Sequence, residues 1–183
     1  MQLFNRPGMR VRVLVIAAAA LACSAAALLP TIAQARQASP QVARCSASNT
    51  DVWFAISPSG AAGTIYYPVE FTNLGSHTCW LSGYPRVFGT TKSGTSFGAA
   101  AGRLTMPVRR IVLRKNQTAH ALLGIVEPGI IPGCHAVTGG GLAVYPPGQA
   151  HKQLVGSFYF PGCRNKKAVY LHVGPVQAGI GVP

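Results

Sequence analysis

The sequence predicts an all-β protein, and three observations support this. Short apolar runs rich in Val, Ile, Tyr, Phe and Thr alternate with clusters of Gly, Pro, Ser and Asn, which is typical of strands joined by turns. After the first 35 residues, no segment sustains a helical pattern for ten residues. Four cysteines are spread over the rest of the chain, at Cys45, Cys79, Cys134 and Cys163. Together these features predict an immunoglobulin-like antiparallel β-sandwich stapled by two disulfides, after an N-terminal signal segment.

Residues 1–35 have the features of a secretion signal. Basic residues without acids come first, an apolar run follows over 13–29, and Ala33-Gln34-Ala35 supplies the small-x-small pattern that signal peptidase recognises. We therefore predict cleavage after Ala35 and a secreted or cell-envelope location. In that oxidising environment cysteines form disulfides.

Two alternatives to free secretion remain open. Cys23 follows a loose version of the small-residue box that precedes a lipid-modified cysteine, which would anchor the protein to the outer face of the membrane. The 17-residue apolar run is also marginally long enough to stay in the bilayer as a signal anchor.

The chain beyond the leader predicts a single domain. A short polar linker over 36–44 precedes a domain over 45–183, which is long enough to bury a hydrophobic core. Residues 36–183 keep 13 basic residues against three acids, a net charge of +10. The acids are Asp51, Glu70 and Glu127. Because so few carboxylates cannot pair widely, most positive charges should face solvent.

The clearest strands are predicted over six runs, at 52–56, 64–72, 109–113, 118–126, 141–145 and 168–173. In the second run Ile65, Tyr67, Val69 and Phe71 fall on one face of a period-two pattern. The glycine-rich stretch 93–102 predicts a long loop or an edge hairpin. No internal repeat indicates a second domain.

The four cysteines are predicted to be structural. Four thiols allow three pairings, and the sequence leaves all three open. Our working hypothesis is the adjacent pairing, Cys45–Cys79 with Cys134–Cys163, in which each bridge would stabilise the fold by roughly 3–4 kcal/mol. The thiols are widely spaced without a Cys-x-x-Cys motif, so we expect neither a redox site nor a metal site. No cofactor is expected.

One motif is typical of catalysis. Gly94-Thr95-Ser96-Phe97-Gly98 matches the G-x-S-x-G nucleophile elbow, and Glu127 and several histidines follow in the order of a hydrolase triad. That elbow joins a buried strand to a helix, whereas glycines and alanines surround Ser96. We assign no catalytic residue and do not expect an enzyme. The alternative is a small secreted hydrolase that uses Ser96 or a carboxylate.

Binding is the favoured class of function. The candidate residues are aromatic and basic: Trp53, Trp80, Tyr84, Arg109, Arg110, Arg114, Lys115, Lys166 and Lys167. Strong positive charge attracts polyanions, but the basic stretches lack the interleaved aromatics that stack nucleic-acid bases. The expected partners are anionic wall polymer, lipid headgroups or an envelope protein. Trp80 directly follows Cys79, so its ring is expected to pack on that bridge or, alternatively, to face a ligand.

The run from Phe71 to Val87 carries a family resemblance. Its pattern TNxGxxxCxLxGYPxV resembles the signature of domain-of-unknown-function family 4232, exported proteins of high-GC Gram-positive bacteria. Weaker matches extend the resemblance over about residues 45–176. It implies an exported or lipid-anchored, disulfide-bonded β-sandwich with no assigned activity. Gly83-Tyr84-Pro85 within the signature predicts a tight turn whose tyrosine bonds its hydroxyl to nearby backbone.

Overall fold

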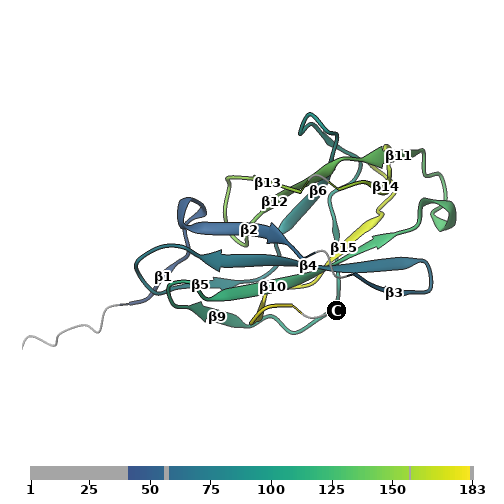
Figure 1. The fold of residues 1–183 in the computed structure, drawn as a ribbon. Coiled ribbons are helices and arrows are strands. Elements are labelled where there is room, and N and C mark those ends of the chain that lie inside the picture. The colour runs from purple at the N-terminus through teal and green to yellow at the C-terminus, as the bar shows by residue number, and fades with distance from the viewer. Residues whose placement is uncertain (1–40, 56–57, 157, 182–183) are drawn as a thin grey trace, which may run out of the picture. The chain divides into compact units, whose positions relative to one another are not determined.

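Two long antiparallel strands, β4 (Thr64–Asn73) and β10 (Thr118–Val126), lie side by side at the centre of the largest sheet (Figure 1). This computed structural model describes residues 41–55, 58–156 and 158–181. The predicted leader, its cleavage site and Cys23 lie outside the described residues. The largest sheet has seven strands in the order β2-β4-β10-β15-β8, with β3 beside β4 and β16 beside β10. The added strands are β2 (Thr50–Phe54), β3 (Ser59–Ala61), β8 (Gly102–Arg103), β15 (Leu171–Val173) and β16 (Gln177–Ala178).

Three smaller sheets complete the fold. A four-stranded sheet has the order β13-β12-β6-β7, a three-stranded sheet the order β1-β5-β9, and β11 pairs with β14. Their strands are β1 (Ala43–Arg44), β5 (Cys79–Ser82), β6 (Arg86–Thr90), β7 (Ser96–Phe97), β9 (Arg110–Leu113), β11 (Ala136–Gly139), β12 (Gly141–Tyr145), β13 (Gln153–Val155) and β14 (Phe160–Cys163). Two short 3-10 helices, η1 (Ala47–Asn49) and η2 (Pro128–Ile130), lie in connections.

The buried faces of the sheets share one hydrophobic core, which confirms the all-β class. Side chains from the largest sheet and from the smaller sheets form a single cluster that includes Val69, Phe71, Leu123, Leu81, Val87, Leu142 and Val144, all fully buried. The predicted period-two face of β4 enters this core at Val69 and Phe71, but Ile65 at the other end is 44% exposed. The first residues of β4 therefore lie outside the core.

The strand predictions differ in accuracy along the chain. Predicted runs 118–126 and 141–145 coincide with β10 and β12, whereas the strand predicted over 168–173 is formed only from Leu171. The glycine-rich stretch forms the edge hairpin, because β7 pairs back onto β6. Two pairs, β1 with β5 and β15 with β8, are parallel over two residues each, so the sandwich is not antiparallel throughout.

Both predicted disulfides are confirmed. Cys45 is bonded to Cys79 and Cys134 to Cys163, with Cα–Cα distances of 4.8 and 5.2 Å. The first bridge holds the chain beside β1 against β5, and Ala43 and Arg44 of β1 fall in the region predicted as a linker. Folded structure therefore begins before the first cysteine.

Candidate functional site

The charges of the domain lie almost wholly on its surface. Every lysine and arginine among the described residues is exposed, as predicted from the shortage of acids. Asp51 and Glu127 are also exposed, but Glu70 is fully buried. The surface is therefore more basic than the composition alone implies.

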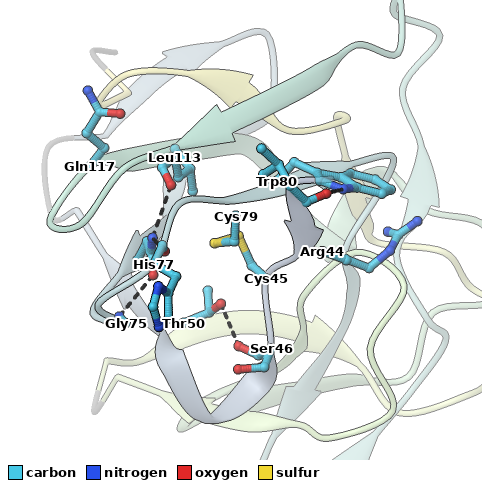
Figure 2. The surroundings of a disulfide bond; sticks show 12 residues. Arg44, Cys45, Ser46, Thr50, Gly75, His77, Cys79, Trp80, Leu113 and Gln117 are labelled. Carbon is cyan, nitrogen blue, oxygen red and sulfur yellow. Dashed lines mark hydrogen bonds between the residues drawn. A yellow bond between two sulfur atoms is a disulfide. The ribbon is translucent and has the colours of Figure 1, made fainter. Parts of the chain in front are cut away.

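Two guanidinium groups lie over the Trp80 ring on the outward face of the β1-β5-β9 sheet. Along β5 the side chains alternate, with Cys79 and Leu81 buried and Trp80 on the opposite face. Arg44 Cζ lies 4.1 Å and Arg110 Cζ 4.5 Å from the centroid of the Trp80 ring. Figure 2 shows Arg44 reaching toward this ring beside the Cys45–Cys79 bridge. Alternation along β5 turns the Trp80 ring away from the Cys79 side chain, and its contact with a ligand stays a prediction.

Backbone pairing places both arginines. Arg44 is opposite Trp80 in the parallel β1–β5 pair, and Arg110 is opposite Ser82 in the antiparallel β5–β9 pair. The carbonyl of Val42 accepts hydrogen bonds from Trp80 Nε1 (3.1 Å) and Arg110 Nη2 (3.2 Å), which ties the indole to one cation. Arg44 Nη1 donates a long bond of 3.4 Å to the carbonyl of Pro147. Within the described residues, most N–H donors of the two guanidinium groups therefore have no hydrogen-bond partner, and these are available to a ligand.

Exposed aliphatic side chains border this stack. Val112, opposite Trp80 across the β5–β9 pair, is 50% exposed. A groove of about 300 Å³ runs from Val112 to Ile180, which is 62% exposed. We call Arg44, Trp80, Arg110 and Val112 the stack face. It combines fixed cations, an aromatic ring and an exposed aliphatic side chain.

The other predicted aromatic residues are held by internal hydrogen bonds. Trp53 lies in β2, where its Nε1 donates to Thr72 Oγ1 at 2.9 Å. The Tyr84 hydroxyl lies 3.0 Å from the carbonyl oxygen of Leu104, to which it donates, so its bond to backbone agrees with the prediction for the turn. An arginine that the prediction did not include, Arg103, lies 5.0 Å from the Tyr84 ring.

The predicted basic residues fall into two separate groups. Arg109, Arg114 and Lys115 flank Arg110 at the two ends of β9 and are exposed. Lys166 and Lys167 are exposed on the loop that follows β14. Only the first group adjoins the stack face. Arg44 was missed because it was placed in the linker, although it directly precedes Cys45 just as Trp80 directly follows Cys79.

The serine of the G-x-S-x-G motif is not in an elbow. Ser96 is exposed in β7, a two-residue edge strand. None of the hydrogen bonds among the described residues joins Ser96 to a histidine or to Glu127. Glu127 lies instead at a groove of about 460 Å³ lined by Ile65, Tyr67 and Phe160 among others. The described residues contain no group of three or more metal-ligating side chains, and no helix among them is long and apolar enough to cross a membrane.

The buried carboxylate, Glu70, lies on the face of the β4–β10 pair that the C-terminal segment covers. Glu70 of β4 lies beneath the segment after β16, where its Oε1 accepts a hydrogen bond of 2.8 Å from the Gly181 N–H. Its Oε2 has no hydrogen-bond partner among the described residues. Burial raises the pKa of the Glu70 carboxyl, an effect that the Gly181 bond and nearby His120 partly offset. His120 Nδ1 itself lies 2.9 Å from the carbonyl oxygen of Gly179.

The protein is a β-sandwich with two disulfides, and its outer surface carries basic and aromatic side chains. The family described as a domain of unknown function, DUF4232, matches residues 45–177. The chain therefore belongs to this family, as the run around Gly83-Tyr84-Pro85 predicted. No curated protein matches the chain.

Proposed function

We propose that the chain is a non-catalytic binding module of the cell envelope, held there by attraction between its basic surface and phosphate-bearing polyanions. The observation that carries the proposal is the distribution of charge. All cations of the described domain are exposed, whereas one of its three carboxylates is buried. Such a surface concentrates anions and accelerates association with them.

The disulfides support the location. Two bridges that close long segments of chain indicate an oxidising, extracytoplasmic environment. The basic and apolar leader with its small-x-small motif indicates export by the same route as other secreted proteins. Phosphate-bearing wall polymers and lipid headgroups are the polyanions that an exported chain meets there.

The test is binding to immobilised polyphosphate and to a cell-wall fraction across a salt series. The protein is expressed with its leader and purified as the host processes it. We expect retention at low salt that fades as the Debye length falls from about 10 Å to about 3 Å between 0.1 and 1 M salt. No retention at low salt would contradict the proposal, and retention that salt does not weaken would indicate a protein partner instead.

Catalysis is tested in the same preparation. Replacement of Ser96 with Ala should leave retention on polyphosphate unchanged, because Ser96 carries no charge. Replacement of Glu127 with Ala should not weaken retention, because it removes an exposed negative charge. If either variant loses a hydrolytic activity that the parent shows on esters or glycosides, the protein is an enzyme and the non-catalytic part of the proposal fails.

A further inference from the structure

We propose that the stack face docks on the surface of a bilayer that contains anionic phospholipids. This inference rests on the proposed function and specifies it, because it assigns the site, the residues and one kind of phosphate-bearing partner. Arg44 and Arg110 would bind headgroup phosphates, and Trp80 and Val112 would enter the interface between headgroups and acyl chains.

The two cations are held close together without an acid between them. Since both guanidinium carbons lie within 4.5 Å of one indole centroid, the two charges are at most about 9 Å apart. None of the three acids of the chain belongs to β1, β5 or β9. Like charges at this separation repel, and a bound anion would relieve that repulsion.

The stack also orders the arginines in advance. A guanidinium that lies over an indole keeps its N–H donors at its rim, where they match the oxygens of a phosphate in pairs. The Val42 carbonyl fixes Arg110 further, through a 3.2 Å bond to Nη2. Because these side chains are ordered before binding, they lose little conformational freedom when an anion arrives.

The exposed aliphatic residues favour a bilayer over a soluble polymer. Val112 and Ile180 are half exposed or more and line the same groove beside the stack. A polyphosphate chain in water would leave these side chains solvated, whereas a membrane interface would bury them. Tryptophan is itself enriched at that interface, since its ring is apolar and its N–H is polar.

Neighbouring charges extend the same surface. Arg109 precedes β9, and Arg114 and Lys115 follow it, all three exposed. Basic residues near an anionic leaflet each contribute about 1 kcal/mol of attraction, which corresponds to roughly fivefold in affinity. The basic residues at the two ends of β9 therefore add positive charge next to the stack face in the chain.

The test is co-sedimentation with vesicles of phosphatidylglycerol and phosphatidylcholine, with pure phosphatidylcholine vesicles as the neutral comparison. The double variant R44Q/R110Q removes both stacked cations. The matched control K166Q/K167Q removes the same charge from the loop after β14. We expect the first to lose at least about tenfold in affinity for the anionic vesicles and the second less than about threefold, given the contribution of each nearby cation.

Two further variants separate the contributions. V112S should weaken vesicle binding about threefold and leave binding to soluble polyphosphate unchanged, because only the bilayer buries this side chain. R110Q alone keeps Arg44 and the Cys45–Cys79 bridge, although it removes the Arg110 bond to the Val42 carbonyl, and it should still lose about fivefold in affinity. Circular dichroism and thermal unfolding of each variant establish that the fold is intact.

The outcomes distinguish this inference from the proposed function. If the parent binds neither vesicles nor polyphosphate, both fail. If it binds polyphosphate but not anionic vesicles, the proposed function stands and the bilayer inference is overturned. If R44Q/R110Q and K166Q/K167Q lose the same affinity, only overall charge matters, and the assignment to the stack face is overturned.

Discussion

The two outward faces of this domain treat charge in opposite ways. On the β1-β5-β9 sheet, Arg44 and Arg110 are displayed in solvent, held against Trp80. On the β4–β10 side of the largest sheet, Glu70 is hidden under the segment that ends at Gly181. The fold therefore makes the surface more positive in two ways: it fixes cations in solvent, and it removes an anion from the surface.

The difference arises from what covers each face. After β16 pairs with β10, the chain turns across the sheet, and the packing is so close that a Cβ on Gly181 would lie 2.4 Å from Pro68 Cβ. On the other face Val112 keeps half of its surface exposed within the described residues. One face is closed by the protein's own backbone, whereas no described segment covers the other, which we propose binds a partner.

The largest expected effect comes from the disulfide beside the stack face, Cys45–Cys79. Replacement of Cys45 and Cys79 with Ala should lower the free energy of unfolding by about 3–4 kcal/mol, because it releases a loop whose ends are 34 residues apart. It should also weaken binding to anionic vesicles, since β1 then no longer holds Arg44 over Trp80. Thermal unfolding and vesicle co-sedimentation measure the two effects.

The second disulfide supplies the matched control. Cys134 and Cys163 are 29 residues apart, so their replacement with Ala should cost a similar free energy of unfolding. This bridge holds β11 against β14, away from the three strands of the stack face. Vesicle binding of the folded variant should therefore stay at the parent level. Equal loss of binding in both variants would show that the first bridge has no special role in the stack face.

The covered face is tested through the pH dependence of stability. Because burial raises the folded-state pKa of Glu70 above 4.5, the folded protein holds this proton more tightly than the unfolded chain. The resulting stabilisation is fully present below pH 4.5 and is lost as the pH rises through the raised pKa. The variant E70Q cannot lose a proton at this position. Relative to the parent, its free energy of unfolding should therefore improve with rising pH, because only the parent must bury an ionised carboxylate.

Urea unfolding of the parent and E70Q between pH 4 and pH 8 measures this difference. The groups that face the Glu70 carboxyl are His120 on β10, Trp53 on β2 and the Gly181 N–H. E127Q serves as the control, because Glu127 is exposed and its substitution should leave the slope unchanged. A parent and an E70Q variant with parallel pH profiles would mean that Glu70 does not titrate differently in the folded state.

The sequence predicted the parts of this molecule that depend on local pattern. An apolar run bounded by turns located β10, and another before Pro146 located β12. The adjacent pairing of cysteines proved right, although nothing local required it. Short strands such as β1 and β8 have only two paired residues, too few for a periodic pattern, so they were not predicted.

The two faces depended on contacts that no local pattern records. Alternation along β4 points Glu70 to the other face of the strand from Val69 and Phe71, the face that would normally be solvated. Its burial depends on a C-terminal segment that returns 111 residues later. Likewise, Trp80 and Arg110 were predicted as separate candidates, but the stack needs Arg44, which reaches the ring only once β1 is paired. The composition predicted a basic surface, whereas only the tertiary structure shows which residues meet on each face.

The smallest effect is expected within the stack itself, and fluorescence isolates it. The chain has two tryptophans, so W53F leaves Trp80 as the only indole emitter. Two guanidinium groups beside the ring should concentrate iodide there, so iodide should quench Trp80 more strongly than its exposure to neutral acrylamide implies.

Adding R44Q/R110Q to W53F should lower iodide quenching by about twofold relative to acrylamide, because the local attraction for anions is gone. Each lost cation–π contact at such an exposed site should cost only about 0.5–1 kcal/mol of stability. K166Q/K167Q in the same background should change neither quantity. If iodide quenching is the same in all three proteins, the two arginines do not create an anion-attracting site at Trp80. The stack face would then differ from the Glu70 face only in lacking the C-terminal segment that covers Glu70.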